Sequence, residues 1–461
     1  MTPYELVKQH YKLPFELYPF QVDIMNDLAL NERAGYYMAV GTGKTITSIS
    51  AALYKLHLKH VKRVVCVMPP VLLVNWERNI QRIPGVSVVR YQGSPKVRSE
   101  INLDVQFILV GYQIFKKDYA YLSSKLEDTV LLLLDEGQAV KNIGSDTYKK
   151  VRDFSITNQL AILTGTPLTT PNDGYAYVNL ISPGTYRSFH QFSNIHTSKT
   201  DFFGNVVEWR NLDLLRENME LNSRFITQAE AIKDLPEVTY NPIFYDLDPG
   251  HAKLYRKLAD EQLLRLEDGK KIDVTNTSAL IHALSQIPMN AEHFSGGTMK
   301  STGLDLLDEL MTELGTDKLV VFTQYRMTNK RLLDYCARYN AVGVYGEITG
   351  PQKQANIDRF VQDPTCRMII MQQSAGGVGV DGLQTVCNTI LFLEMGYTST
   401  GFEQAVARVL RTGQTKPVTV HLAVAVGTIQ KKTLDVVLEK DTVLGVVQKG
   451  AGGLRAAIYG E

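Results

Sequence analysis

Two short segments of this chain carry the residue types that bind and cleave a triphosphate. The first, Gly41–Thr45, reads GTGKT and stands between a short apolar run and a stretch with helical periodicity. Glycines let the backbone curl so that its N–H groups face phosphate oxygens, and the N-terminus of a following helix adds a positive dipole. The Lys44 ammonium would hold the β- and γ-phosphates, and the Thr45 hydroxyl would bind Mg²⁺. The sequence therefore predicts a phosphate-binding loop made of Gly41, Thr42, Gly43, Lys44 and Thr45.

A pair of adjacent carboxylates forms the second feature, in the segment LLLLDEGQ, Leu131–Gln138. Asp135 at the tip of a buried strand would complete the Mg²⁺ shell, and Glu136 would polarise the attacking water as general base. Paired carboxylates at a strand end can also be a surface turn, but their position after a phosphate loop and intervening βα units favours catalysis. The GTPase signature Asn-Lys-x-Asp is absent, since Asn329–Leu332 reads NKRL. We therefore expect ATP and Mg²⁺ as ligands.

Two arginines far downstream, Arg408 and Arg411, stand three residues apart beside an apolar run. This spacing predicts a helix that carries both guanidinium groups on one face. An arginine that reaches the γ-phosphate from a second domain stabilises transition-state charge and can raise the rate ~10³–10⁵-fold. Taken alone, the pair is equally compatible with a solvated helix face.

The elements that would position these residues alternate between apolar runs and helical stretches. Four runs rich in branched residues are bounded by turn signals, at residues 63–68, 105–110, 129–135 and 159–164. Such runs are typical of parallel strands buried on both faces. The alternation predicts an α/β fold with a parallel sheet, in an ATP-binding domain over residues 1–235.

The pattern breaks and then resumes. Residues 172–222 contain scattered aromatics and no strand run, so we expect a partly helical insertion there, and residues 236–300 should form a crossover and a helical segment. Strand-like runs return in a second α/β domain predicted over residues 301–461. They lie at residues 318–324, 341–346, 367–372, 389–394 and 418–424.

The composition of the 461 residues is that of an ordinary globular protein, with 44% hydrophobic and 21% charged residues. The net charge of +1 neither suggests nor excludes a nucleic-acid partner. The four cysteines form no Cys-x-x-Cys pair and no zinc pattern, which favours reduced thiols. No apolar run is long enough to span a bilayer, and the N-terminus lacks a signal-peptide core. We expect a soluble, cytoplasmic, monomeric protein with no membrane partner.

In order along the chain, these features resemble the motifs of superfamily 2 helicase-type motors, specifically the SWI/SNF-type branch of DNA translocases. The resemblance extends from about residue 17 to residue 432. It implies two RecA-like domains in tandem, ATP in the cleft between them and movement along duplex DNA. The matching segments are LYPFQ (17–21), GTGKT (41–45), VMPPVLLVNWERNI (67–80), DEGQAVKN (135–142), LTGTPLTTP (163–171), VVFTQY (320–325), SAGGVGVDGLQ (374–384), QAVARVLRTGQ (404–414) and GTIQKK (427–432).

The resemblance also implies roles for individual residues at the nucleotide. Gln21 would contact the adenine base, and Gly379 and Asp381 would contribute to the nucleotide site. Arg408 and Arg411 would be the finger pair. The implied catalytic set is Lys44, Asp135, Glu136, Gln404, Arg408 and Arg411.

On the DNA side, the resemblance implies contacts to the phosphate backbone from both domains. Thr164 and Thr166 would couple the state of the γ-phosphate to the grip on DNA. The implied DNA-binding residues are Pro69, Trp76, Tyr112, Lys141, Gln324, Ser374 and Gly376.

Three departures from the branch's pattern narrow the expectation. Gln138 stands where many members have histidine, and Glu394–Ser399 reads EMGYTS where the branch often has Trp-Asn-Pro. The large helical insertions of nucleosome remodellers are missing. The chain therefore looks most like the small fork-remodelling and branch-migrating members, including phage-encoded ones that act in a host cytoplasm. Its DNA would be duplex, forked or four-way, in replication, recombination or repair.

Two other functions remain open from the sequence. A nucleotide-gated clamp would close on DNA without travelling, although such a clamp need not retain both arginines. An RNA-directed helicase of the DEAD-box kind is the other, although the DEGQ segment and Trp76 count against it. The insertion could supply a wedge that stacks on bases at a fork, or its aromatics could form a small local core. These aromatics are Tyr175, Tyr177, Tyr186, Phe189, Phe192, Phe202, Phe203 and Trp209.

Overall fold

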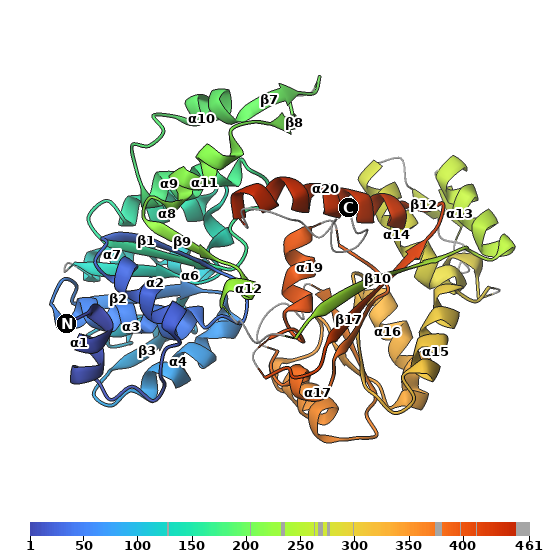
Figure 1. The fold of residues 1–461 in the computed structure, drawn as a ribbon, viewed down its shortest axis with the longest axis horizontal. Coiled ribbons are helices and arrows are strands. Elements are labelled where there is room, and N and C mark those ends of the chain that lie inside the picture. The colour runs from blue at the N-terminus through green and yellow to red at the C-terminus, as the bar shows by residue number, and fades with distance from the viewer. Residues whose placement is uncertain are drawn as a thin grey trace. The chain divides into compact units, whose positions relative to one another are not determined.

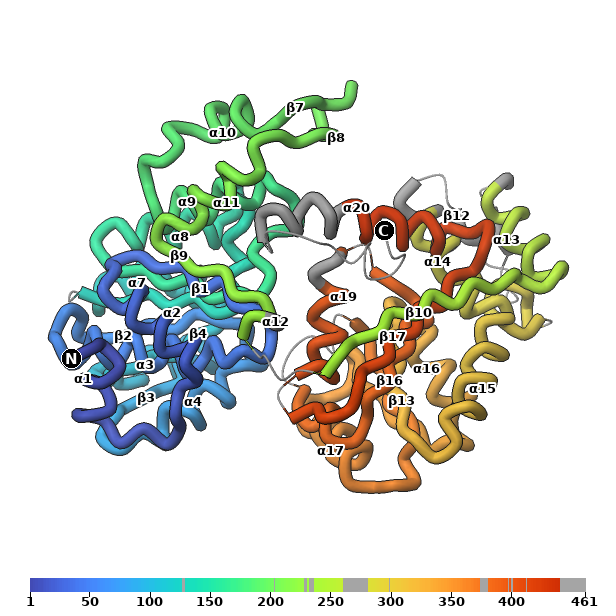
Figure 2. Tube along the Cα trace, in the orientation of Figure 1, coloured from blue at the N-terminus to red at the C-terminus, as the bar shows by residue number. Residues whose placement is uncertain are grey.

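The computed structural model describes residues 1–126, 129–202, 204–231, 236–261, 263–265, 271–273, 277–297, 299–373, 380–396, 398–411 and 413–448. The chain divides into two compact units, the first mainly Met1–Lys233 and the second mainly Asp234–Thr442. Figures 1 and 2 show the chain in the same view, as a ribbon and as a tube. Each unit is described by itself. The predicted boundaries of the three segments stay predictions.

The first unit is built on a seven-stranded parallel sheet with the strand order β3-β4-β2-β5-β6-β1-β9. Its strands are β1 (Arg33–Met38), β2 (Arg63–Met68), β3 (Val88–Tyr91), β4 (Phe107–Gly111), β5 (Val130–Leu134), β6 (Gln159–Thr164) and β9 (Ser223–Ile226). Helices cover both faces of this sheet (Figure 1). They are α1 (Pro3–His10), α2 (Pro19–Ala29), α3 (Lys44–His57), α4 (Leu73–Gln81), α5 (Pro95–Ser99), α6 (Tyr112–Lys117), α7 (Tyr119–Lys125), α8 (Asp146–Phe154), α9 (Asp173–Ile181) and α12 (Gln228–Ala231).

Alternate side chains of the central strands enter two separate hydrophobic cores. In β5, Leu131 and Leu133 join the cluster that contains Ile24, whereas Leu132 and Leu134 join the one on the other face. Because successive side chains of a strand point to opposite faces, a run that is apolar at every position must be buried on both. The apolar runs of the sequence therefore correspond to a sheet that is sandwiched between helix layers.

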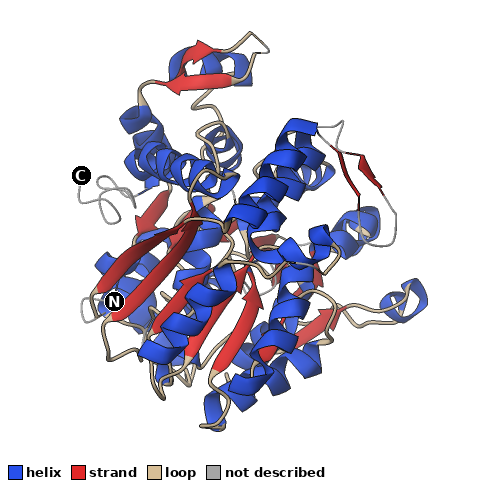
Figure 3. Ribbon diagram, turned by 90° about the vertical axis from the view of Figure 1, so that its right-hand side faces the viewer, coloured by secondary structure: helices blue, strands red, loops and turns tan. Residues whose placement is uncertain are grey.

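The insertion contains a strand pair that the sequence did not predict. After α10 (Phe189–His196), β7 (Thr197–Thr200) and β8 (Val206–Trp209) form an antiparallel hairpin, and α11 (Leu212–Glu220) follows. The hairpin lies beside α10 in Figure 1, and its strands are drawn red at the top of Figure 3. Both strands are short and mostly exposed, so they lack the apolar run by which a strand is detected.

The second unit has a six-stranded parallel sheet with the order β10-β17-β16-β13-β15-β14. The strands are β10 (Val238–Tyr245), β13 (Leu319–Thr323), β14 (Val342–Val344), β15 (Met368–Gln372), β16 (Thr389–Phe392) and β17 (Val418–Ala425). The accompanying elements are α13 (Pro249–Glu261), β11 (Leu263–Arg265), β12 (Lys271–Asp273), α14 (Thr277–Ser295), α15 (Gly303–Glu313), α16 (Arg326–Tyr335), α17 (Gly350–Gln362), α19 (Ser399–Val406) and α20 (Ile429–Gln448). The predicted α/β fold with two parallel sheets flanked by helices is confirmed.

All four cysteines are buried and free, as expected for reduced thiols. Within the described part of the chain, no helix has the length and apolar character needed to cross a membrane.

Candidate functional site

The phosphate loop connects the carboxyl end of β1 to the N-terminus of α3. Gly41 and Gly43 have φ angles of 82° and 79°, in the left-handed region that favours glycine. A Cβ atom on Gly43 would lie 2.2 Å from Gln21 Nε2, so a side chain at this position would collide with α2. The loop therefore has the backbone curl that the sequence predicts, and α3 begins directly after it at Lys44.

Gln21, on α2, forms a hydrogen bond to the backbone of this loop. Its side chain is only 1% exposed, and Nε2 donates to the carbonyl oxygen of Thr42 at 2.7 Å. Its Oε1 accepts from the backbone N–H of Tyr18 at 2.9 Å, which caps the start of α2. The amide is thus engaged with the protein at both ends. The contact to the adenine base stays a prediction.

Lys44 points its ammonium group back over the same loop. Nζ donates to the carbonyl oxygens of Met38 and Ala39 at 2.8 and 3.1 Å. The side chain of Thr45, next along the chain, is partly exposed. The loop therefore combines curled backbone, a cation and a hydroxyl in the arrangement that phosphate binding requires.

Asp135 follows β5 and is 5% exposed. Trp76 Nε1, from α4, donates to its Oδ2 at 2.8 Å, and the backbone N–H of Glu136 donates to its Oδ1 at 2.9 Å. The hydroxyl of Tyr112, at the start of α6, donates to the Asp135 carbonyl oxygen at 2.9 Å. The carboxylate is therefore held in one orientation by the Trp76 indole and the Glu136 amide, and Tyr112 fixes the backbone of the same residue.

This geometry gives two residues of the predicted DNA-binding set a structural role. Trp76 is 0% exposed and Tyr112 is 9% exposed, and each side chain donates its hydrogen bond to Asp135. The DNA contacts that the resemblance implies for them stay predictions. The sequence could not distinguish these roles, because an aromatic residue with a donor suits a DNA surface and a buried carboxylate equally well.

Burial of the Asp135 carboxyl raises its pKa to about 6, and the neighbouring Glu136 charge adds to this effect. The Trp76 hydrogen bond and the Lys44 charge oppose it. Each oxygen accepts one N–H bond, which leaves lone pairs for a hydrated Mg²⁺. Among the described residues no group of three or more His, Cys, Asp or Glu could hold a metal ion. Mg²⁺ fits such a site, because it is bound through one or two carboxylates, waters and substrate phosphates.

Glu136 has an unusual backbone conformation, with φ 54° and ψ 54°. A non-glycine residue in the left-handed region costs about 1–3 kcal/mol, and such strain clusters at functional sites. Gln138 Nε2 donates to Glu136 Oε2 at 2.8 Å. The backbone conformation and this hydrogen bond together fix the position of the partly exposed carboxylate.

Gln138 also connects Glu136 to the segment that follows β6. Its Oε1 accepts from Thr164 Oγ1 at 3.0 Å, and Thr164 Oγ1 in turn accepts from the backbone N–H of Thr166 at 3.1 Å. The sequence marked Gln138 only as a departure from histidine. The structure brings it together with both predicted coupling residues, in one hydrogen-bonded path that ends at Glu136.

The DNA contacts predicted for three further residues also stay predictions. Pro69 is partly exposed at the carboxyl end of β2. Lys141 Nζ donates to Thr169 Oγ1 at 2.7 Å. Gln324 is partly exposed at the end of β13. Ser374, Gly376 and Gly379 lie outside the described residues.

The arginine segment does not form the single helix that its spacing predicts, so that prediction is wrong. Helix α19 ends at Val406, and the backbone N–H groups of Arg408 and Val409 bond to the carbonyl oxygens three residues earlier, at 3.1 and 3.0 Å. Such bonds tighten a helix end into a turn, and Gly413, at φ 95°, carries the chain onward.

The two arginines consequently have different surroundings. Arg408 is 8% exposed, whereas Arg411 forms an ion pair with Asp381, whose side chain is 74% exposed. Gln404 is partly exposed on α19. Arg411 and the predicted nucleotide residue Asp381 are therefore brought together. The roles of Gln404, Arg408, Arg411 and Asp381 at ATP stay predictions.

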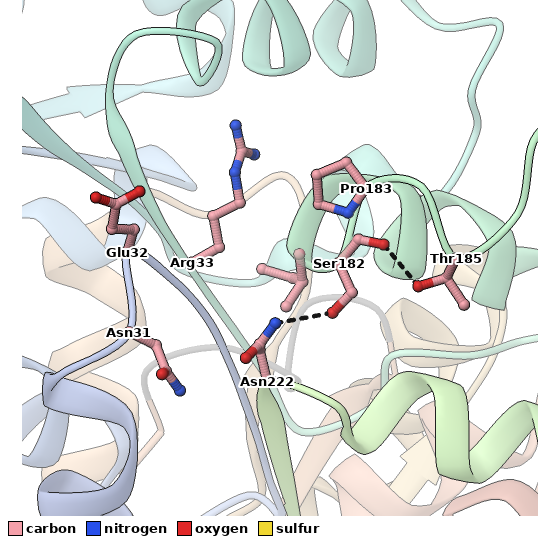
Figure 4. Close-up of a pocket in the computed structure, with 8 residues that line it drawn as sticks. Asn31, Glu32, Arg33, Ser182, Pro183, Thr185 and Asn222 are labelled. Atoms are coloured by element: carbon pink, nitrogen blue, oxygen red, sulfur yellow. Dashed lines mark hydrogen bonds between the residues drawn. The ribbon is translucent and has the colours of Figure 1, made fainter.

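A separate pocket of about 360 Å³ lies at the opposite end of β1 (Figure 4). Its polar groups already bond within the protein: Arg33 Nη1 donates to the carbonyl oxygen of Leu180 at 2.7 Å, and Asn222 Nδ2 donates to Ser182 Oγ at 3.1 Å. We assign it no role at the phosphate loop. The residues drawn are Asn31, Glu32, Arg33, Ile181, Ser182, Pro183, Thr185 and Asn222.

Comparison with known proteins connects this geometry to a family. Residues 36–293 match the SNF2-related domain, and residues 302–413 match the helicase conserved C-terminal domain. The chain is 24% identical over 460 residues to the CHD3-type chromatin-remodeling factor CHR7 of Arabidopsis thaliana, covering 92% of this chain and 37% of that protein. It is also 24% identical over 425 residues to the ATP-dependent helicase MG018 of Mycoplasma genitalium, covering 88% and 39%.

The chain thus spans less than half the length of these two relatives. Among solved structures, it is similar to the Sulfolobus solfataricus SWI2/SNF2 ATPase core in complex with dsDNA, with a TM-score of 0.45 and 21% identity over 95% of this chain and 94% of that one.

Replacing Trp76 with Phe should move the acid limb of Mg²⁺-dependent ATP hydrolysis to higher pH. The change keeps a buried ring and removes a hydrogen bond that lowers the pKa of Asp135, so this pKa should rise above about 6. The protonated carboxyl, which binds Mg²⁺ poorly, should then persist to higher pH. The measurement is kcat as a function of pH. Tyr112→Phe is the control, because it removes a bond to the backbone and should leave the limb in place. An unmoved limb in Trp76→Phe contradicts the assignment.

Replacing Gln138 with Leu should lower kcat about tenfold, because Glu136 and Thr164 lose the amide they share. The KM for ATP should stay close to the wild-type value, since the amide bonds to Glu136 and Thr164 rather than to the phosphate loop. Steady-state kinetics gives both values. Gln138→His is the matched variant, because an imidazole can again donate and accept. An equal loss in both variants would show that the hydrogen-bonded path is unimportant.

Proposed function

The chain belongs to the SNF2-related domain family, and we propose that it is an ATP-dependent DNA translocase acting on duplex or branched DNA. The observation that carries this proposal is the hydrogen-bonded path from Glu136 through Gln138 to Thr164 and Thr166. A protein that only binds nucleotide has no need to join the group that activates water to a separate segment of the fold. The match of a helicase conserved C-terminal domain supports an enzyme of the ATPase and helicase type.

ATP is the substrate, and the residues of the first unit divide the work on it. Lys44 binds the phosphates, and Glu136 orients the attacking water in a conformation fixed by Gln138. Thr45 and Asp135 would hold Mg²⁺, which supplies charge neutralisation at the phosphates when bound. When the γ-phosphate leaves, the change at Glu136 reaches Thr164 and Thr166 through the amide of Gln138.

The second unit contributes the arginines. We propose that Arg411 is the finger residue, and that it exchanges the Asp381 carboxylate for the γ-phosphate when the nucleotide site closes. Arg408 would assist from its more buried position. Such an exchange makes hydrolysis depend on domain motion, which is how a motor couples chemistry to a step.

DNA would be gripped through its phosphates, without reading of sequence. Pro69 and Lys141 in the first unit and Gln324 in the second are the described residues proposed for this grip. Movement on DNA is favoured over a static clamp because both arginines are present, and over RNA-directed action because Asp135 is organised by Trp76, which the DEAD-box pattern lacks. Fork remodelling and branch migration are the proposed finer activities.

The β7–β8 hairpin supports action at forks. Hydrogen bonds join the two sides of its turn: Asp201 Oδ1 accepts from the backbone N–H of Asn205 at 2.8 Å, Oδ2 accepts from Asn205 Nδ2 at 2.9 Å, and Gly204 adopts φ 83°. This turn holds Phe202 with 96% of its surface exposed. An apolar ring presented in this way suits stacking on an unpaired base.

Four other aromatics of the insertion have a structural role. Tyr175, Tyr177, Tyr186 and Phe192 are buried, and Tyr186 Oη bonds to His196 Nε2 at 2.7 Å. They form the local core that carries the hairpin. Phe203 lies outside the described residues. Phe202 is by far the most exposed of the described aromatics and is the residue we propose as the wedge.

Removing the Arg411 guanidinium by Arg411→Ala should lower kcat ~10³-fold and leave ATP binding near normal. Lys44→Ala should abolish turnover. ATP hydrolysis on single-stranded, duplex, forked and four-way DNA, with a nucleotide-binding titration, measures both effects. Arg411→Lys keeps the charge without the planar fork and should rescue only in part. Near-normal turnover in Lys44→Ala, or lost ATP binding in Arg411→Ala, would overturn the respective assignment.

Phe202→Ala should slow strand separation on forked DNA about tenfold, the loss expected for one stacked base. Val207→Ala is the matched control, because Val207 is 55% exposed on β8 of the same hairpin but away from the tip. Unwinding of a labelled fork is the readout. Equal rates for Phe202→Ala and wild type would remove the hairpin from the mechanism.

A further inference from the structure

Glu394 is a buried carboxylate in the second unit that the proposed mechanism does not use. It follows β16, opens the segment that departs from the family's pattern, and is 3% exposed. Three donors converge on it. The backbone N–H groups of Gln324 and Tyr325 both bond to Oε2 at 3.0 Å, and Thr328 Oγ1 bonds to Oε1 at 2.6 Å.

These donors belong to the connection between β13 and α16. Tyr325 is the N-cap residue of α16 and makes no side-chain capping bond of its own, so the Glu394 carboxylate takes over this task. On the other side of the connection, Gln372 Nε2 donates to the Gln324 carbonyl oxygen at 3.3 Å. Gln324 and Tyr325, which follow β13, are therefore held by side chains from β15 and from the end of β16, the strands on either side of β13.

The same carboxylate ends a hydrogen-bonded chain that begins at a kink in α14. Asn290 has non-helical angles, φ −136° and ψ 36°, shortly after Pro288. Its Nδ2 donates to Thr328 Oγ1 at 2.7 Å, and Thr328 donates onward to Glu394. Only an acceptor can end this chain, because the Thr328 hydroxyl proton points toward Glu394. The ionised carboxylate accepts from all three donors, whereas a protonated carboxyl would add a further hydrogen to a site whose three described partners all donate.

The connection borders an open pocket of about 880 Å³ whose lining includes Gln324, Tyr325, Arg326 and Lys330. Arg326 and Lys330 both pair with Glu347, at 2.7 and 2.5 Å. Two cations that share one carboxylate on an exposed surface can exchange it for a phosphate of a polyanion. The chemistry of the pocket thus suits the DNA backbone.

We propose that Glu394 is a positioning residue that sets Gln324 and Tyr325 for contact with DNA phosphates, and that its ionised form is the one that does so. This inference rests on the proposed translocase function. Glu394 itself touches no DNA. It acts through the two backbone N–H groups and through Thr328.

The charged and titratable groups around Glu394 come from three elements. Arg331 on α16 favours the ionised carboxylate and is itself paired with Glu292 of α14 at 2.7 Å. Burial raises the pKa of Tyr245 on β10, which keeps the phenol neutral. Burial of Glu394 outweighs these influences and raises its pKa to about 7, so the ionised fraction falls as the pH drops through neutrality.

The test compares wild type with Glu394→Gln, which keeps the size of the side chain and places an N–H₂ group among N–H donors. We expect the duplex concentration that half-saturates ATP hydrolysis to rise about tenfold, because the N–H groups of Gln324 and Tyr325 lose their charge-assisted hydrogen bonds. The KM for ATP should change less than about twofold, because these bonds do not reach the phosphate loop. In wild type this half-saturating concentration should increase as the pH falls from about 8 to about 6. In Glu394→Gln it should not change over the same pH range.

A second measurement does not depend on activity. Hydrogen exchange of the Gln324 and Tyr325 amides should be faster in Glu394→Gln than in wild type, without DNA present. If Glu394→Gln does not fold, Thr328→Val and Thr328→Ser decide the matter. Thr328→Val should reproduce the defect, and Thr328→Ser, which retains the hydroxyl, should not.

The outcomes separate the two proposals. Wild-type DNA affinity, pH profile and amide exchange in Glu394→Gln would overturn the positioning role while wild-type stimulation by DNA supports the translocase. If DNA does not stimulate wild-type ATP hydrolysis at all, the translocase proposal fails together with the DNA part of this inference. Equal effects of Thr328→Val and Thr328→Ser would also overturn the positioning role.

Discussion

A carboxylate taken out of water is the constraint around which the first unit's site is organised. Burial of an ionised group is costly unless donors replace its hydration. Asp135 meets this requirement with the indole N–H of Trp76 and the amide of Glu136. These bonds commit α4 to the core and help place Glu136 in its strained conformation. The packing of the sheet and the chemistry at its edge are therefore one arrangement.

The second unit solves a similar problem at the end of β16. Glu394, like Asp135, follows a central strand, is almost fully buried and collects N–H donors from an adjacent segment. Ligands of parallel sheets bind at the carboxyl ends of the strands. A buried acid at that edge holds the adjacent loop in place by accepting hydrogen bonds from its backbone N–H groups. In the first unit Asp135 holds the turn at Glu136, and in the second Glu394 holds the connection beside a cationic pocket.

Chains of side-chain hydrogen bonds connect these carboxylates and their loops to other segments. The path Glu136–Gln138–Thr164–Thr166 joins two loops of the first unit, and Asn290–Thr328–Glu394 joins a helix kink to a strand end in the second. Each relay uses short side chains with a defined donor direction. Such networks are sensitive to the loss of any one member, because a buried donor without an acceptor costs more than an average hydrogen bond contributes.

The sequence by itself determined the two parallel sheets, the phosphate loop, the acidic pair and the family. These features depend on local patterns: apolar runs for strands buried on both faces, glycines for a curled loop, and ordered motifs. Tertiary structure alone decided that Trp76 and Tyr112 serve Asp135, that Gln138 is a bridge, that the arginines lie beyond the end of α19, and that Phe202 is exposed. Each of these facts concerns which atoms meet across distant segments. A residue type specifies what a side chain can donate or bury, but only the packed chain specifies the partner.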